Sequence, residues 1–583
     1  MALGEFSFRT RDSSLQRLRR EVFDVLVIGG GITGSAVARD AASRGLSVAL
    51  IERNDFAYGT SSRSSKLIHG GLRYLENMEF GLVFEALAER ALLLKTMPHM
   101  VRPLPFYFPV YEGDKNGKGM MGLGMWLYDL LALFRAPGFH QSFNKEKLLI
   151  EIPFLRPEGL TGGFRYYDAS MWDDVIGVET LRSAQDLGSA VANYVEAVSP
   201  IWKGDVIAGF RVRDREPRGG LRAEFEIRAK RTIVCAGPWT DEIGKRLNTS
   251  WRGWLKPSKG VHLIFDLKRL PVPGAMVMTN PVDGRISFVI PRPDLGAGVT
   301  IVGTTDSPVT KDPIAAKDPD RAEVEAEDVT YLIGLLSRYF PGLGITAKDI
   351  VSAYVGVRPL VDLSGDGKSL QKVSREHHID QGPGSVTIAA GGKYTTHRKM
   401  AQEIVDFMIA GWRADARHGK CERVPTRIGA SRTKLPINPK ALTEAVTEAR
   451  QKAMSSGIAV DPLLYERYGA EALDVAQLQS QHASVRASGG AKAALASDPD
   501  GFPLIEAQLR HGIRTGMVLR LEDFYFRRTP LFASRADHGM PWAEALSKIW
   551  AEERELPSTA AVEELERLRA EVERRSAWIK TLT

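Results

Sequence analysis

One segment near the N-terminus restricts the fold of this chain more than any other. The sequence "FDVLVIGGGITGSAVARDAASRGLSVALIERNDF" starts with an apolar strand, Val25–Ile28, that runs directly into a G-x-G-x-x-G pattern. A helix with small apolar residues on one face follows, and a second apolar strand, Leu46–Ile51, ends at the acid Glu52. Strand, glycines, helix, strand and acid in this order predict a βαβ unit that binds a dinucleotide, within an α/β fold.

Each part of this segment has a physical role in a dinucleotide site. Gly29 permits a tight turn, Gly31 lets a pyrophosphate approach the backbone, and Gly34 lets the helix pack closely on the strand. We expect the pyrophosphate at the helix N-terminus, where unpaired N–H groups and the helix dipole favour an anion. Glu52 lies about twenty residues beyond the glycines, where a carboxylate can accept hydrogen bonds from ribose hydroxyls.

Two later segments favour FAD over NAD. In "RAKRTIVCAGPWTDEI" and "GSVTIAAGGKYTTHRKMAQEI", buried strands at 232–235 and 386–389 end in glycine, and the second leads into a helix at about Thr395. The residues that we expect to contact the cofactor there are Ala236, Gly237, Gly391, Gly392 and Thr395. A strand that ends in glycine and meets a helix N-terminus is again an anion site. Together with the end of the first strand, the chain has three strand ends of the nucleotide-binding type, which fit an extended FAD better than one NAD. No second complete G-x-G-x-x-G unit is present for NADH, so we expect the substrate to reduce the flavin directly.

Composition excludes several other classes of protein. The 583 residues are 44% hydrophobic and 26% charged, which is ordinary for a globular protein of about three domains. Two distant cysteines give neither a disulfide framework nor zinc spacing, and no other group has metal spacing, so we expect a reducing compartment and no catalytic metal. We expect that the N-terminal segment does not act as a secretory signal, because it has no long apolar core before Arg20. We also expect no nucleic-acid binding, because the sequence has no basic cluster interleaved with aromatics. The net charge of +7 favours anionic partners in general.

One apolar stretch has two interpretations. The segment "MMGLGMWLYDLLALF", residues 120–134, is shorter than the roughly 20 residues that span a membrane, and Asp129 interrupts it. It is either a helix in the core or in a dimer interface, or an exposed apolar surface that lies on a bilayer.

Taken together, the motifs resemble those of the FAD-dependent, quinone-linked glycerol-3-phosphate dehydrogenases. The stretches that carry the resemblance are "VIGGGITG", "TSSRSSKLIHGGLRYLE", "AGPW", "IVGTTDSP", "GVRPL" and "GGKYTTHRKMA", in family order. The likeness is strong over about residues 20–410 and continues more weakly through "EAQLRHGIRTGMVLRLEDFYFRRTPLF". It implies oxidation of sn-glycerol 3-phosphate to dihydroxyacetone phosphate, with electrons passing through FAD to a membrane quinone.

The resemblance also implies a domain organisation. We expect a glutathione-reductase-like FAD-binding domain, an interleaved substrate domain with a mixed sheet, and a helical C-terminal cap domain. The expected boundaries are an N-terminal arm at 1–20, the first FAD-binding part at 21–110, the substrate domain with interleaved FAD-domain strands (including 228–245) at 111–300, the end of the substrate domain with the last FAD-binding part at 301–412, and the cap at 413–583. The implied location is the cytoplasmic face of the inner membrane, with peripheral attachment; a homodimer is left open.

The run "YGTSSRSSKLIHGGLRYLE" is predicted to line the cofactor and then the substrate. Small polar residues and glycines suit close approach to a pyrophosphate or flavin. The predicted cofactor contacts in this run are Thr60, Ser61, Ser62, Ser64, His69, Gly70 and Gly71. The resemblance assigns Arg73 to the substrate phosphate and Tyr74 to a neighbouring donor position, so flavin contact should give way to substrate contact between Gly71 and Arg73.

Three further residues are predicted to be both catalytic and substrate-binding. Arg358 in "GVRPL" stands at a strand end and can bind a phosphate as a fork. Lys393 in "GGKYTT" lies near a helix start, where a cation suits an anionic ligand or a reduced flavin better than it suits helix stability. His262 in "KGVHLIF" lies on an apolar strand, and the family likeness puts it near the substrate, where an imidazole could accept a proton.

Three rival functions stay open at the level of sequence. A glycerol-3-phosphate oxidase, which passes electrons to oxygen, would share these motifs. An amino-acid or amine oxidase of the same superfamily has less need of Arg73, Arg358 and Lys393 together, because its substrate carries no phosphate. A flavin-binding scaffold or redox sensor would not turn over glycerol 3-phosphate at all.

Overall fold

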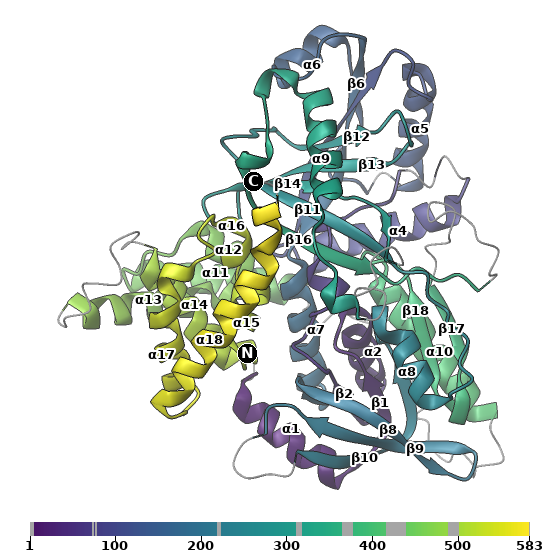
Figure 1. The fold of residues 1–583 in the computed structure, drawn as a ribbon, viewed down its shortest axis with the longest axis vertical. Coiled ribbons are helices and arrows are strands. Elements are labelled where there is room, and N and C mark those ends of the chain that lie inside the picture. The colour runs from purple at the N-terminus through teal and green to yellow at the C-terminus, as the bar shows by residue number, and fades with distance from the viewer. Residues whose placement is uncertain are drawn as a thin grey trace.

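The computed structural model describes residues 5–72, 75, 78–133, 135–217, 223–309, 318–363, 377–414, 439–487 and 501–581. Their elements form three parts (Figure 1): an α/β part that contains the βαβ unit, a second part built on a mixed sheet, and a helical part at one side of both. The expected fold class is confirmed.

An eight-stranded sheet surrounds the predicted βαβ unit. Its strands are β1 (Val22–Ile28), β2 (Val48–Ile51), β7 (Ala190–Ala192), β8 (Val195–Lys203), β9 (Val206–Asp214), β10 (Glu224–Val234), β17 (His377–Gln381) and β18 (Thr387–Gly391). The order is β17-β18-β10-β1-β2-β7, and the β8–β9 hairpin pairs with β10. Because β1, β10 and β18 are parallel neighbours, the three glycine-bearing strand ends meet at one edge of the sheet.

Helices cover both faces of this sheet. On one face α2 (Ile32–Ser43) packs between α7 (Asp173–Asp186) and α10 (His397–Ala414). On the other face α1 (Phe8–Arg20) buries Leu15 and Leu18 against the core. The N-terminal arm is therefore a helix that covers the sheet, and α8 (Thr240–Leu247) packs into the same core.

The close helix–strand packing predicted for the third glycine is confirmed. A Cβ on Gly34 would lie 1.9 Å from the carbonyl oxygen of Gly29, so a larger residue would force α2 away from the turn after β1. Gly29 has φ of +112°, and a Cβ there would lie 2.4 Å from the carbonyl oxygen of Cys235. Both positions therefore require glycine.

A ten-stranded mixed sheet forms the second part. Its strands are β3 (Leu67–Ile68), β4 (Val101–Tyr111), β5 (Gln141–Phe143), β6 (Leu160–Met171), β11 (Ser258–Asp266), β12 (Ala275–Thr279), β13 (Ile286–Arg292), β14 (Val299–Gly303), β15 (Ser307–Pro308) and β16 (Ile350–Arg358). The helices α4 (Phe80–Thr96) and α5 (Lys118–Leu131) pack against one core of this sheet, and α6 (Lys145–Glu151) and α9 (Ala326–Tyr339) against the other.

The strands move one expected domain boundary. The boundary at residue 110 falls inside β4, which pairs with β6 and β12 of the second sheet. The first FAD-binding part therefore ends before β3, the first strand of that sheet. The chain later returns to the first sheet with α7 and β7–β10, and the segment 228–245 lies within this return and the start of α8.

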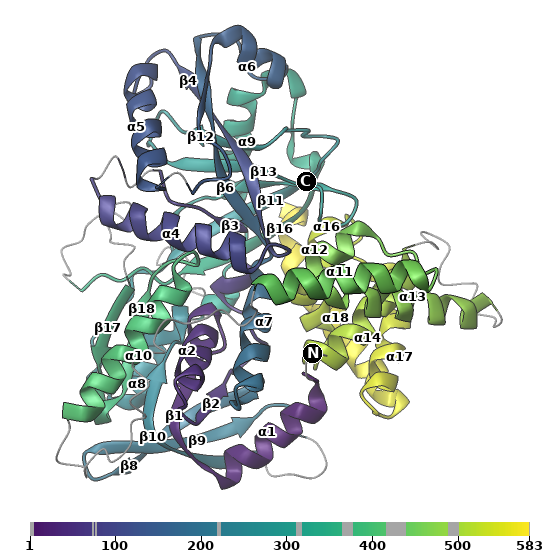
Figure 2. The ribbon, with the colours of Figure 1, turned by 180° about the vertical axis from the view of Figure 1, so that it is seen from behind.

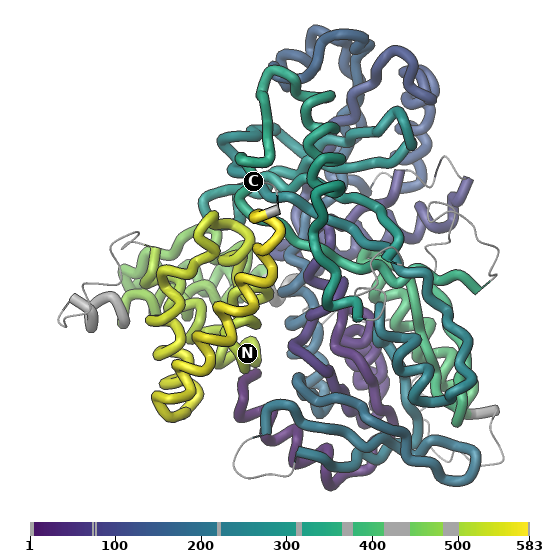
Figure 3. Tube along the Cα trace, viewed as in Figure 1, coloured from purple at the N-terminus to yellow at the C-terminus, as the bar shows by residue number. Residues whose placement is uncertain are grey.

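The C-terminal part consists of helices, as expected for a cap. Its α-helices are α11 (Pro439–Ser455), α12 (Pro462–Tyr468), α13 (Ala472–Ala487), α14 (Phe502–Thr515), α15 (Leu521–Asp523), α16 (Leu531–Ser534), α17 (Ala543–Glu553) and α18 (Ser558–Ser576). Its own core is rich in aromatic and leucine side chains. Figure 3 shows the C-terminal helix running back toward the second sheet, and α16 packs on β16.

Candidate active site

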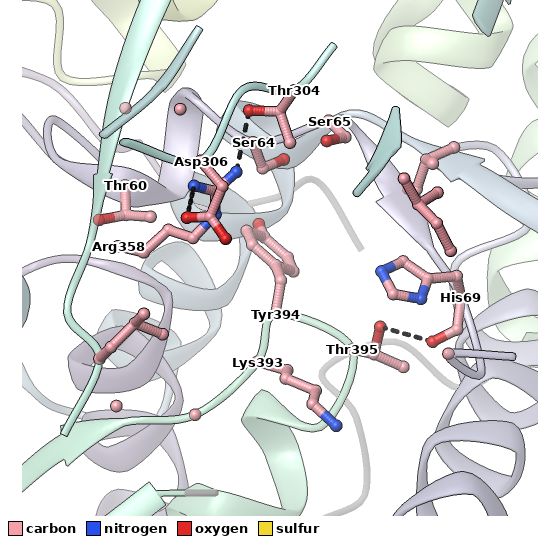
Figure 4. Close-up of a pocket in the computed structure, with 18 of the residues that line it drawn as sticks. Thr60, Ser64, Ser65, His69, Thr304, Asp306, Arg358, Lys393, Tyr394 and Thr395 are labelled. Atoms are coloured by element: carbon pink, nitrogen blue, oxygen red, sulfur yellow. Dashed lines mark hydrogen bonds and ion pairs between the residues drawn. The ribbon is translucent and has the colours of Figure 1, made fainter. Parts of the chain in front are cut away.

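A cavity of about 930 Å³ lies where the carboxyl ends of β1, β10 and β18 face the second sheet. It brings together most of the residues that the sequence predicts for cofactor and substrate. The predicted residues that line it are Gly29, Gly31, Glu52, Thr60, Ser61, Ser64, His69, Gly71, Ala236, Gly237, His262, Arg358, Gly391, Gly392, Lys393 and Thr395. Figure 4 shows part of this wall.

Other predicted residues do not line this cavity. Gly34 serves packing, as described above. Ser62 instead lines a cavity of about 100 Å³ beside the cap. Gly70 is enclosed by packing, because a Cβ there would lie 2.4 Å from both Leu87 and the Tyr128 hydroxyl. As cofactor contacts, these three positions stay predictions; Arg73 and Tyr74 lie outside the described residues.

Glu52 directly follows β2 and is hydrogen-bonded to the glycine turn after β1. Its carboxylate accepts hydrogen bonds from the backbone N–H of Gly30 at 2.7 Å and of Asn54 at 2.8 Å. Burial raises the pKa of this carboxyl, and the two backbone donors offset only part of that effect. Further donors, such as ribose hydroxyls, would stabilise its ionised form.

The start of α2 is open toward the cavity. A Cβ on Gly31, the N-cap residue, would meet only the Ser61 hydroxyl, at 3.2 Å. The Ser61 oxygen accepts from the backbone N–H of Ile32 at 2.9 Å, and the Thr60 hydroxyl donates to the carbonyl of Val357 at 2.6 Å. An anionic pyrophosphate fits this helix end. Together with Glu52 and the cavity volume, these features fit FAD.

Arg358 ends β16 and is held by a ring of oxygens. Its Nη2 donates to the Thr304 hydroxyl at 2.9 Å, and its Nη1 lies 3.4 Å from the Asp306 carboxylate and 3.2 Å from the Ser258 hydroxyl (Figure 4). A Cβ on Gly260 would lie 2.5 Å from Nη2, so this glycine leaves space for the guanidinium. Thr304 and Asp306 belong to "IVGTTDSP", a motif whose individual roles the sequence did not reveal.

Lys393 and Thr395 lie in the loop between β18 and α10, which begins at His397 rather than at Thr395. The Thr395 hydroxyl donates to the His69 carbonyl at 3.3 Å, which ties this loop to the "LIHGG" segment (Figure 4). The neighbouring Tyr394 hydroxyl donates to the carbonyl of Asp173 at the start of α7. The loop is thereby fixed against two other elements.

His262 is buried in the middle of β11. Its Nε2 lies 2.8 Å from the Ser65 hydroxyl, and its ring stacks on Tyr354 with centroids 4.7 Å apart. Burial, assisted by the cations Arg358 and Lys66, holds the pKa of His262 well below the usual 6.5. His262 is therefore neutral at physiological pH.

Ser65 and the groups around it were not predicted. Ser65 lies in the same "SSRSS" run that supplied other candidates, so the run itself was the available signal. The ion pair of Lys66 with Asp173, at 2.5 Å, had no sequence signal because the two residues are 107 positions apart.

The end of the cavity near α4 and α5 carries apolar side chains beside the polar Glu79, Lys115 and Asn116. Met78, Phe80, Met120 and Leu123 line it. The same region carries exposed apolar side chains, which we call the apolar face; its members are Met78, Phe80, Phe84, Met120, Leu123, Trp126, Leu130, Leu133 and Phe139. The helix α5 (Figure 2) therefore has one side in the core, with Met121, Met125 and Tyr128, and one exposed apolar side, which fits a dimer interface as well as a bilayer surface.

Among the described residues, no helix is both long and apolar enough to cross a membrane. The same part of the chain contains no group of histidine, cysteine and acidic side chains that could hold a metal ion. Cys235 is a buried free thiol.

The fold and the cavity define an FAD-dependent oxidoreductase. Residues 24–398 match the family described as FAD dependent oxidoreductase, and residues 441–560 match the C-terminal domain of alpha-glycerophosphate oxidase. FAD is therefore the cofactor of this fold.

Similar proteins of known name place the chain in a narrower family within the FAD-dependent oxidoreductases. The aerobic glycerol-3-phosphate dehydrogenase of Staphylococcus haemolyticus is 32% identical over 524 residues, covering 89% of this chain and 88% of the relative. The Staphylococcus aureus protein of the same name is 31% identical, covering 95% and 94%. The crystal structure of the Bacillus halodurans glycerol-3-phosphate dehydrogenase with FAD superposes with a TM-score of 0.73 at 26% identity, covering 98% of each chain. The chain belongs to the aerobic glycerol-3-phosphate dehydrogenase family.

Proposed function

We propose that the protein oxidises sn-glycerol 3-phosphate to dihydroxyacetone phosphate and passes the electrons to a membrane quinone. The observation that carries the substrate assignment is that the cations Arg358 and Lys393 line the same cavity as His262, together with Arg63, Lys115 and Arg285. Cations suit a phosphate monoester, and Arg can bind one through two donors. The relatives named above carry the same substrate in their names.

The protein's own residues have separate tasks in this reaction. When bound, FAD supplies the acceptor for the hydride that leaves carbon 2 of the substrate. Arg358 and Lys393 hold and orient the phosphate, and the cavity wall excludes water. The proton of the oxidised hydroxyl goes to the His262 side of the cavity. Arg73 and Tyr74 remain predicted substrate contacts.

The apolar face supports a membrane quinone as the final acceptor. Met120 and Leu123 of α5 are 63% and 66% exposed and also line the cavity, so the cavity wall is continuous with the apolar face. An exposed apolar surface of this kind suits contact with a bilayer, and a lipid-soluble quinone can reach the site from there. We propose peripheral attachment at the cytoplasmic face of the inner membrane.

The substrate assignment is tested by turnover with a soluble dye acceptor. We expect activity with glycerol 3-phosphate and at least about 100-fold lower kcat/KM with unphosphorylated glycerol, since a lost phosphate contact costs about 3 kcal/mol or more. Equal activity with glycerol, or activity with glycine or proline instead, would contradict the proposal.

The acceptor is tested in an oxygen electrode with and without a soluble quinone analogue. We expect slow oxygen uptake and fast quinone reduction with the same substrate. Rapid oxygen uptake without quinone, with release of hydrogen peroxide, would favour the glycerol-3-phosphate oxidase alternative.

A further inference from the structure

We propose that Ser65, rather than His262, contacts the hydroxyl group that is oxidised, and that Ser65 passes the proton to Nε2 of His262. This inference rests on the proposed function and names a relay within its site. Ser65 is then a catalytic residue, and His262 acts through it.

The surroundings of His262 enclose most of the imidazole. The side chain is 2% exposed, and Nδ1 is buried and makes no hydrogen bond within the described part of the chain. The Tyr354 ring covers one side at 17° to the imidazole, and a Cβ on Gly303 of the neighbouring strand would lie 2.5 Å from Cδ2. Nε2 faces the Ser65 hydroxyl at 2.8 Å. The hydrogen bond between Ser65 and Nε2 therefore offers a proton a path from the cavity to His262.

Ser65 is held in position by its two chain neighbours. The Ser64 hydroxyl donates to the Asp173 carboxylate at 2.7 Å, and Lys66 Nζ lies 2.5 Å from the other oxygen of the same carboxylate. The Tyr354 hydroxyl also donates to the Ser64 carbonyl at 2.8 Å. Asp173 thus holds the residues on both sides of Ser65, which itself lines the cavity.

The charges around His262 suit a transient acceptor. Arg358 from β16 and Lys66 from the loop disfavour the imidazolium, so the ring is neutral and able to accept a proton. A weak base suffices, because the alcohol proton becomes strongly acidic only as the hydride departs. Once the product has left, the imidazolium returns its proton readily through Ser65 to the open cavity, which resets the site.

The step balances in atoms and charge. The C2–H bond breaks and its electron pair leaves as hydride to the cofactor, while the alcohol O–H bond breaks and its proton forms a bond to Ser65 Oγ. The former Ser65 proton forms a bond to His262 Nε2, and the carbonyl of dihydroxyacetone phosphate forms. The resting histidine must therefore carry its proton on Nδ1, with Nε2 as the acceptor.

The test compares the variants S65A, S65T, H262N and S65A/H262N in anaerobic single-turnover flavin reduction. We expect S65A to slow reduction by about 100-fold, the lower end of general-base effects, and S65T to restore most of the rate. The double variant should reduce its flavin at a rate within about 3-fold of the S65A rate, because both changes break the same relay. Binding of dihydroxyacetone phosphate, followed by flavin absorbance, should change by less than about 3-fold in S65A, unlike in a variant with a collapsed site.

A spectroscopic readout is independent of turnover. Nitrogen-15 NMR of histidine-labelled protein, with the His262 signals assigned by their loss in H262N, should show a protonated Nδ1 and an unprotonated Nε2. The relay would be overturned if S65A reduced its flavin at the wild-type rate. It would also be overturned if the rate losses of S65A and H262N multiplied in the double variant, or if Nε2 carried the proton. If wild-type flavin is not reduced by glycerol 3-phosphate at all, the proposed function fails instead.

Discussion

At the scale of single residues, the site depends on side chains that several elements hold in place. The Arg358 guanidinium is fixed from β11 by Ser258 and from the segment after β14 by Thr304 and Asp306. Its orientation is therefore set before any substrate arrives, which reduces the entropy cost of binding an anion. A lysine would keep the charge but lose the planar fork.

Replacing Arg358 with lysine tests this orientation. We expect R358K to raise the KM for glycerol 3-phosphate by about 10-fold to 100-fold, which corresponds to a loss of about 1–3 kcal/mol for a charged hydrogen bond. FAD content, measured by absorbance, should stay at the wild-type level. An unchanged KM in steady-state kinetics would show that Arg358 does not contact the substrate phosphate.

A second residue-scale prediction concerns pH and stability. Burial lowers the pKa of His397 to about 4, while its Nδ1 donates to the Tyr394 carbonyl at 2.7 Å. Because the unfolded state binds a proton below about pH 6.5 and the folded state does not, this group costs stability as pH falls from about 6.5 to about 4. The loss is roughly 2 kcal/mol at pH 5.

H397N keeps a donor near the position of Nδ1 and removes the titration. Its thermal unfolding midpoint should therefore fall less than that of the wild type between pH 7.5 and pH 5. Parallel midpoints in differential scanning fluorimetry would mean that His397 is not neutral in the folded protein.

At the scale of elements, α5 shows how one helix can serve two environments. Met121, Met125 and Tyr128 pack into the core of the second sheet, whereas Trp126 and Leu130 are 63% and 55% exposed. A helix of a soluble surface would expose polar residues at these positions. The face therefore needs another apolar partner, and the bilayer is the partner that we propose.

Serine replacements at two positions of α5 and at Leu133, just beyond its end, test the bilayer as this partner. We expect the combined variant W126S/L130S/L133S to lose co-sedimentation with phospholipid vesicles and to keep its turnover with the soluble dye acceptor. Its matched control is I150S/M454S/V562S, which removes three exposed apolar side chains elsewhere, 78%, 83% and 60% exposed, and should still bind vesicles. Equal vesicle binding by both variants would contradict attachment through α5.

How much the sequence could predict depended on separation along the chain. The turn after β1, the strand ends at Ala236 and Gly391 and the position of Arg358 were predictable, because neighbouring residues determine a turn or a strand end. The contact of Ser65 with His262 spans 197 residues and that of Tyr394 with Asp173 spans 221. No local pattern encodes such pairs, since only the fold brings their strands and loops together.

At the scale of the whole molecule, buried ion pairs join the cap to the FAD-binding part. Asp55 lies three residues beyond Glu52, and its carboxylate accepts hydrogen bonds from Arg527 at 2.6 Å and from Arg528 at 2.9 Å. Asp55 is fully buried. In a second pair, the guanidinium of Arg467 in the cap lies 3.2 Å from the carboxylate of Asp174 in α7. Water cannot reach these buried charges to replace a lost partner, so removing one charge of a pair lowers the stability of the fold strongly.

D55N should therefore loosen the cap. We expect a loss of about 3–5 kcal/mol in stability, seen as a lower thermal midpoint and faster proteolysis of the C-terminal part. The control E544Q removes an exposed partner of Lys548 and should leave the midpoint unchanged. A D55N midpoint equal to that of the control would show that these pairs do not hold the cap.

The most direct test of the proposed function is an anaerobic spectral titration of the purified holoprotein with sn-glycerol 3-phosphate. We predict that the oxidised-flavin absorbance bleaches completely with about one equivalent of dihydroxyacetone phosphate formed per FAD, and that a quinone analogue restores it. An unchanged flavin spectrum at saturating glycerol 3-phosphate would contradict the proposed function.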